Sequence, residues 1–273
     1  MSHWEFPGSE PIDVFIELAA GSVALTAEAT DVTTVSLSAR FGRNADKLSE
    51  VRVSFDNGRL EVVGPKRTGL WRGYPGLDLT VTLPSGSRCA VRTASADVTS
   101  TGELAELDAN TASGDVTATA VTRNFQAVTA SGDVRAEETG EVADVRTVSG
   151  DVRINRAGGD IQARTASGDV SIATAAGSAT ATTASGDVRI GSMARGRADV
   201  NTASGDVVVG VARDVGVYLD LASLSGSVTS QLEDAEPSED VALEVRCRTL
   251  SGDIRIARAS SAGADRRQVQ PAG

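Results

Sequence analysis

The stretch Thr147-Val-Ser-Gly-Asp-Val152 decides the fold, because close copies of it return along the chain at a nearly fixed interval. Its serine recurs at positions 95, 113, 131, 149, 167 and 185, a constant step of 18 residues. Three more copies carry serines at positions 204, 225 and 251, after steps of 19, 21 and 26 residues. Nine copies, six of them in strict register, indicate a repeat protein whose units stack on one another.

The residues inside each repeat predict β-strands. Helical repeats need about 33 residues or more, so a step of 18 is too short for them. After the motif aspartate, apolar and polar residues alternate, as in Val152-Arg-Ile154, which is the period of a strand with Val and Ile inward and Arg outward. A second inward column stands two residues before each motif threonine: Val91, Ala109, Ala127, Val145, Ala163, Ala181, Val200 and Cys247.

A half-repeat indicates that each coil has two sides. Small or apolar residues also stand nine positions after a motif valine: Leu107, Phe125, Ala143, Ile161 and Ala179. Stacked coils would pair each strand with its copies at about 4.8 Å. The sequence therefore predicts an all-β protein, a parallel β-helix (β-solenoid) of about nine coils of about 18 residues. The handedness of parallel connections favours a right-handed coil.

The flanks divide the chain into further regions. Residues 1–10 are expected to be an N-terminal extension with a frayed terminus, and 11–90 an irregular β region that leads into the solenoid and caps it. The repeats occupy 91–257, in the order of the sequence, and 258–273 read as a disordered tail. Five carboxylates in 233–240 predict a solvated loop between the last two copies.

Each motif residue has a physical role in this interpretation. Glycine is expected to allow positive φ at a sharp corner. Serine and aspartate can bond turn backbone groups, and stacked threonine hydroxyls can bond along the ladder. In the first copy Ala96 replaces the glycine, so that corner should differ.

A column of aspartates is the sharpest candidate for a site. Carboxylates about 4.8 Å apart repel by about 0.9 kcal/mol in water and about 3.5 kcal/mol at an effective dielectric constant of 20, so something must offset the repulsion. Bound Ca²⁺ is one alternative, and the favoured one is that each carboxylate accepts turn N–H bonds beside arginines such as Arg135, Arg153 and Arg189. The column comprises Asp97, Asp115, Asp133, Asp151, Asp169, Asp187, Asp206 and Asp253.

Enzymatic chemistry has little support in the sequence. The only histidine is His3, so a Ser-His-Asp system lacks a base, and zinc sites built from His and Cys lack ligands. No Walker-type loop or dinucleotide fingerprint occurs. We therefore expect no catalytic residues, no cofactor and no metal site, although a carboxylate-based glycoside hydrolase stays an alternative. Nine aromatic residues in all would make its sugar cleft hard to build.

A possible interaction loop lies in 66–75, which concentrates aromatic and cationic residues in an acidic, aromatic-poor chain. Such clusters are typical of interface hot spots, whereas the plainer alternative is a loop that caps the solenoid. The residues concerned are Lys66, Arg67, Trp71, Arg72 and Tyr74.

Charge and hydropathy restrict the partners. A formal net charge of −11 argues against nucleic acid and anionic lipid. There is no run of 18 apolar residues, so no membrane span is expected, and the absence of a signal pattern predicts a cytoplasmic protein, with surface display left open. Cys89 and Cys247 should lie many coils apart, too far for a disulfide.

The sequence resembles the bacterial putative-adhesin family, a domain of unknown function. The resemblance rests on the Thr-Ala-Ser-Gly-Asp-Val units and on the lead-in Leu77-Asp-Leu-Thr-Val-Thr-Leu-Pro84. It implies a β-helix-like fold and an adhesive role, but assigns no functional residues. The expected function is a non-enzymatic binding or scaffold protein with a protein or glycan partner, either monomeric or self-associating end to end into filaments.

Overall fold

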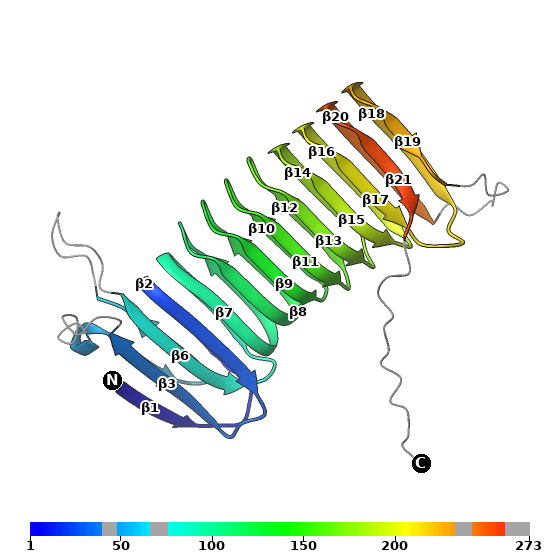
Figure 1. The fold of residues 1–273 in the computed structure, drawn as a ribbon. Helices are drawn as coiled ribbons and strands as arrows, with labels where there is room; N and C mark the ends of the chain where they lie inside the picture. Colours follow the sequence, from blue (N-terminus) through cyan, green and yellow to red (C-terminus); the bar gives the residue numbers. More distant parts are fainter. Residues whose placement is uncertain (40–47, 66–75, 233–241, 260–273) are drawn as a thin grey trace, which may run out of the picture.

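The computed structural model describes residues 1–39, 48–65, 76–232 and 242–259, and all statements below concern these residues. The chain is an elongated all-β stack of coils (Figure 1). Each interior coil has strand structure on either side, as the half-repeat predicts. The interior strands are β8 (Val116–Val128), β9 (Val134–Thr139), β10 (Val142–Arg146), β11 (Val152–Ala157), β12 (Asp160–Arg164), β13 (Val170–Ala175), β14 (Ala179–Ser185), β15 (Val188–Met193), β16 (Gly196–Ser204) and β17 (Val207–Val211). Strand β8 covers both sides of its coil and pairs with β9 and with β10.

The register of the interior follows the repeat. Val152 of β11 lies opposite Val134 and Val170, and all three are buried. On the other side Ala163 of β12 lies between Val145 and Ala181, again buried, as is the half-repeat residue Ile161. The two inward columns predicted from the sequence are therefore confirmed. They meet in a thin core of small and β-branched side chains, which explains why the chain needs few aromatic residues.

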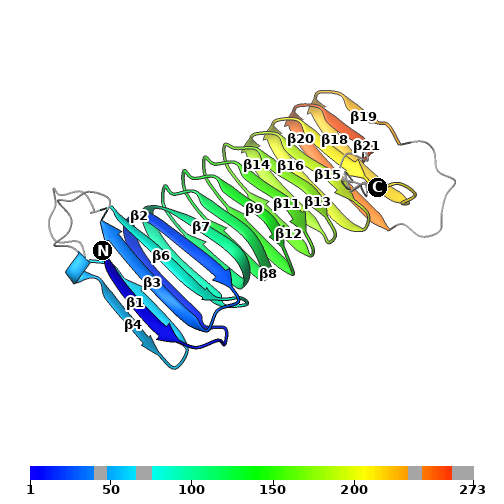
Figure 2. The ribbon, with the colours of Figure 1, turned by 60° about the horizontal axis from the view of Figure 1, so that its bottom comes forward.

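The N-terminal region adds further layers to this stack. Strand β2 runs parallel to β7 along residues 13–27, and its other edge pairs in parallel with β5 and β6. Strands β3, β4 and β1 then add antiparallel cover beyond β5 and β6 (Figure 2). The bounds are β1 Ser2–Pro7, β2 Asp13–Glu28, β3 Val32–Ala39, β4 Arg52–Asp56, β5 Arg59–Val63, β6 Leu77–Pro84 and β7 Arg88–Asn110. The irregular β region expected at the N-terminal end of the solenoid is confirmed.

The expectation of a frayed N-terminus is wrong. Residues 2–7 form β1, which pairs with β3 in antiparallel register. His3 is held by hydrogen bonds between Nδ1 and Ser36 Oγ at 2.9 Å and between Nε2 and Glu5 Oε1 at 3.0 Å. The edge of β3 supplies a backbone ladder, which a reading of composition alone could not detect.

At the other end, the coils do not stack in the order of the sequence. The last strands, β20 (Leu243–Ser251) and β21 (Ile254–Arg258), lie between β16 and β17 on one side and β18 (Val217–Ser225) and β19 (Val228–Ser230) on the other. Figure 1 shows the red β20 and β21 inserted in this way. The predicted sequential order is wrong here, and the coil of β18 and β19 is the outermost layer.

The two copies at this end also differ in how much of the motif they keep. The copy in 249–254 has Thr249, Gly252 and Asp253, so it can bond to neighbours on both sides. The copy in 223–228 has Ser223 in place of the threonine and Ser227 in place of the aspartate. A coil with only one neighbour needs fewer of these groups, since terminal repeats form one interface instead of two.

Cys89 and Cys247 lie near opposite ends of the stack, and both are free and buried. Cys89 is the register partner of Val14, whereas Cys247 lies between Val200 and Leu221. Burial raises the pKa of each thiol to about 12, because the thiolate would lose its hydration. Both therefore act as small core residues.

Candidate functional site: a polar ladder and an outer groove

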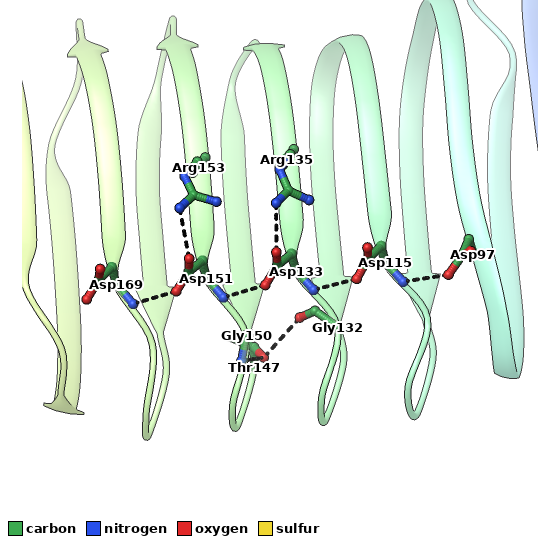
Figure 3. Close-up of polar contacts among 10 residues, drawn as sticks. All are labelled: Asp97, Asp115, Gly132, Asp133, Arg135, Thr147, Gly150, Asp151, Arg153 and Asp169. Carbon is green, nitrogen blue, oxygen red and sulfur yellow. Dashed lines mark hydrogen bonds and ion pairs between the residues drawn. The ribbon is translucent and has the colours of Figure 1, made fainter.

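The aspartate column forms a continuous hydrogen-bonded ladder along one corner of the solenoid (Figure 3). Oδ1 of Asp133 accepts the backbone N–H of Asp151 at 2.9 Å, and Oδ1 of Asp151 accepts that of Asp169 at 3.0 Å. The same bond links every consecutive pair from Asp97 to Asp253 and ends on the N–H of Ser227. Backbone donors were expected, but here they belong to the next coil, so the ladder joins coils to each other.

Arginines are further partners of two aspartates in this ladder, whereas the predicted contact of Arg189 with the column is not formed among the described residues. Arg135 bonds Asp133 Oδ2 at 2.7 Å, and Arg153 bonds Asp151 Oδ2 at 2.8 Å. The pKa of Asp133 lies below its usual value, chiefly because of the N–H of Asp151 and then because of Arg135. Within the described ranges no cluster of three or more His, Cys, Asp or Glu side chains is placed to hold a metal ion. Carboxylate repulsion is thus offset by N–H donors along the whole column and by guanidinium groups at Asp133 and Asp151.

Threonine and glycine complete the corner. In one coil Thr147 Oγ1 accepts the N–H of Gly150 at 3.0 Å and donates to the carbonyl of Gly132, one coil away, at 3.4 Å. The predicted positive φ is absent at Gly132 and Gly150, and it occurs only at the motif glycines of the last three copies, Gly205, Gly226 and Gly252. A Cβ on Gly150 would instead overlap the carbonyl of Gly132. Close stacking of the coils, and not an unusual backbone angle, excludes a side chain at such interior glycines.

The corner at Ala96 differs, as predicted. There β7 continues as an unbroken strand through the motif, in register with β2. Ala96 is fully buried and lies opposite Gly21, the residue without a side chain in that pair. A Cβ on Gly21 would overlap the backbone of Leu77 in β6, so the close approach that requires a glycine lies between β2 and β6.

The predicted interaction loop cannot be placed, because Lys66, Arg67, Trp71, Arg72 and Tyr74 lie outside the described residues. The same holds for 233–241 and for 260–273 of the predicted tail.

A shallow groove of about 690 Å³ lies on the outer face near the N-terminal end, over β5, β2, β7, β8 and β10. Register aligns its lining in rows. Asp13 lies opposite Arg59 and Arg88, and Phe15 lies opposite Ala90. The small Ala90 side chain leaves a depression beside the half-buried Phe15 ring.

Further rows extend the groove across β8 and β10. Asn124 lies opposite Glu106 and Val142, and Gln126 lies opposite Asp108 and Asp144. These side chains alternate along their strands with buried residues such as Phe125, so all of them project outward. The groove thus combines two arginines and two amides with four carboxylates over a small apolar floor.

Some of these polar groups are already paired and others are free to bind. Arg88 holds Asp13 with two bonds, of 2.6 and 3.0 Å, and the carboxylates of Asp108 and Asp144 bond Arg92 and Arg146. Among the described residues, the exposed side chains of Arg59, Asn124 and Gln126 have no hydrogen-bond partner. They could donate and accept hydrogen bonds without breaking an existing contact.

Comparison with known proteins agrees with this architecture. The model of the Toastrack DUF4097 family matches residues 13–257, nearly the whole length of the stack. The chain belongs to the Toastrack DUF4097 family. No curated protein matches it.

Solved structures share the fold of this Toastrack chain at low identity. One is a putative adhesin from Bacteroides fragilis NCTC 9343, with 12% identity, a TM-score of 0.50, and coverage of 93% of this chain and 96% of the other. Another is a putative lipid binding protein from Parabacteroides distasonis ATCC 8503, with 14% identity, a TM-score of 0.51 and the same coverage. At such identities the likeness shows the fold alone.

The groove of this Toastrack chain was not predicted from the sequence. Its residues come from strands far apart in the chain, and the small residue that opens it, Ala90, precedes the first copy of the motif. Only the pairing of β2 with β7 brings Phe15 beside Ala90. One signal was available: Asn124 and Gln126 are outward residues that flank the inward Phe125.

Proposed function

We propose that this Toastrack protein is a non-enzymatic binding module whose outer groove holds a neutral, hydroxyl-rich glycan chain. The observation that carries the proposal is the set of unpartnered outward groups in the groove, Arg59, Asn124 and Gln126. Amide and guanidinium groups offer planar, directed donors, and amides also offer acceptors, which suit ligands rich in hydroxyl groups. The apolar patch of Phe15, Ala90 and Val142 would support the face of a sugar ring.

The charge of the groove narrows the class of ligand. Asp13, Glu106, Asp108 and Asp144 outnumber Arg59 and Arg88. An anionic ligand would meet more like than opposite charges, which disfavours nucleic acid, anionic lipid head groups and acidic glycans. A neutral glycan meets no such barrier.

The rigid stack supports such a role. Each groove residue sits on a strand whose inward neighbours are fully packed, as with Leu107 and Phe125. Sites on strands are held more firmly than sites on loops, so little conformational entropy is lost on binding.

The test is binding of the full chain to an array of neutral oligosaccharides, with the best binder then titrated by calorimetry. Gln126→Ala and Asn124→Ala should each weaken binding about tenfold, the loss expected for a hydrogen bond or two. The matched control is Gln162→Ala, because Gln162 is an outward glutamine in the row of Gln126 and Asp144 but lies outside the groove lining.

Other outcomes would identify other functions. Equal loss in Gln162→Ala, or no oligosaccharide bound, would overturn the glycan proposal. Binding to vesicles of anionic lipid that Gln126→Ala abolishes would make the groove a lipid site instead. Cleavage of the bound oligosaccharide, lost on Glu106→Gln or Asp108→Asn, would replace the binding module by a glycoside hydrolase.

A further inference from the structure

The outermost coil, formed by β18 and β19, leaves an open edge. Among the described residues β18 pairs with β20 and β19 with β21, and no strand lies along their outer side (Figure 1). The inward side chains of Val217, Leu219 and Leu221 are only partly buried, whereas their counterparts in the other coils are almost fully buried. An unpaired strand edge whose inward side chains are apolar and incompletely covered can act as a template for the addition of another strand.

Exposed apolar side chains gather at this end. Tyr218 is 54% exposed, Leu224 82%, Val228 46% and Leu250 59%. Of the seven large apolar side chains recorded as exposed in the described ranges, these four belong to the last two coils. A concentration of this kind marks an interaction surface more often than chance exposure does.

The opposite end of the stack excludes simple head-to-tail growth. There the antiparallel strands β1, β3 and β4 extend beyond the parallel layer of β5 and β6. An incoming β18 edge would therefore not meet a further parallel coil. The aspartate ladder also could not continue into a further stacked coil. The last coil carries Ser227 in place of an aspartate and offers no carboxylate to a following coil.

We propose that two copies of this chain join tail to tail, through antiparallel pairing of β18 with β18 and of β19 with β19. A two-fold axis perpendicular to the two sheets brings both pairs of edges together at once. An isologous contact of this kind closes, so it yields a dimer and not a filament. With Leu221 on the axis, Tyr218 faces Leu224 of the second copy, and Asp220 faces Ala222, so no two charges stand directly opposite.

The charge of the open end allows a second copy to approach. The whole chain has a net charge of −11, but the strands of the last two coils do not share this excess of negative charge. Their carboxylates are Asp220, Glu244 and Asp253, and their arginines are Arg246, Arg248, Arg255 and Arg258. Arg248 also lies 3.4 Å from the Asp220 carboxylate.

Sedimentation equilibrium on the full chain tests the proposal. The wild type should show a reversible equilibrium between monomer and dimer, and small-angle scattering should show the dimer to be about twice as long as the monomer. The double variant with Tyr218→Lys and Leu224→Lys should raise the dissociation constant of the dimer at least tenfold. The control is Val148→Lys, because Val148 is an apolar side chain with the same 54% exposure on an interior coil.

Each contrary result overturns a definite part of the inference. A strictly monomeric wild type at millimolar concentration would refute it, and a mass that grows beyond the dimer would replace it by filament formation. A dimer unaffected by the double substitution, or equally weakened by Val148→Lys, would place the contact elsewhere. Melting temperatures of the variants show whether they remain folded. Because the inference does not depend on the glycan groove, either proposal can fail alone.

Discussion

An interior coil and the outermost coil are built from the same repeat and differ in how many neighbours they have. The corner of Thr147 and Gly150 is bonded to coils on both sides, and inward residues around it, such as Ile154, are fully buried. The corner of Ser223 and Gly226 is bonded on one side only, and Leu221 remains partly exposed. In a solenoid each coil is thus stabilised mainly by its two interfaces, so position along the stack decides how much a residue matters.

The largest expected difference in stability is between alanine substitutions of Gly150 in an interior coil and Gly226 in the outermost coil. Gly150→Ala places a methyl group on the carbonyl of Gly132, with coils fixed on both sides, and should destabilise the protein by at least about 3 kcal/mol. Gly226→Ala meets the carbonyl of Gly252 in the same way and adds backbone strain at a φ of 157°, but its coil can move outward, so a smaller loss of about 1–2 kcal/mol is expected. Urea denaturation measures both, and equal losses would refute the role of stack position.

A smaller difference in stability is expected between substitutions at the threonine position of the motif, Thr147 in an interior coil and Ser223 in the outermost coil. Thr147→Val keeps the shape but leaves the N–H of Gly150 without its acceptor, which costs about 1–3 kcal/mol for a buried donor. Ser223→Ala removes only a bond donated to Gly252 at a half-exposed site, where water can replace it, so a loss under about 1 kcal/mol is expected. If thermal melting ranked the two variants in the opposite order, the interior clamp would not be the stronger one.

The smallest effect concerns pH and the two ends of the same ladder. The pKa values of Asp133 and Asp253 are both lowered, chiefly by the backbone N–H groups of Asp151 and Ser227. A lowered folded-state pKa means that stability is present above the unfolded value, 3.8, and is lost as the pH falls through the folded value. Stability should therefore decline below about pH 4.

Hydrogen exchange can separate the two ends during this acid titration. The amides of β19 should lose protection before those of β13, since Asp253 is the one aspartate of the ladder that bonds the outermost coil, whereas β13 has a ladder aspartate bond on each side. Asp253→Ala should expose β19 already at neutral pH while leaving β13 protected. Simultaneous loss in both strands would show that the stack opens as a single unit.

Much of the interior could be predicted because the repeat acts locally. The alternation of Val152, Arg153 and Ile154 specifies a strand and its buried face whatever lies on either side. The aspartate column could likewise be predicted to need backbone donors, since stacked carboxylates must be neutralised. The glycine was only partly explained, because at interior positions such as Gly150 the restriction comes from the neighbouring coil and not from the backbone angle of the glycine itself.

The sequence by itself determined the repeat, the two strands per coil and the inward columns, because these depend on contacts that each copy makes in the same way. Only the tertiary structure decided which coil lies next to which. A strand with the motif of β20 can pair with any copy of itself, so its insertion between β16 and β18 is a choice among non-local partners. The pairing of β2 with β7, which forms the groove, and the open edge of β18 arise from the same kind of choice, which no local period encodes.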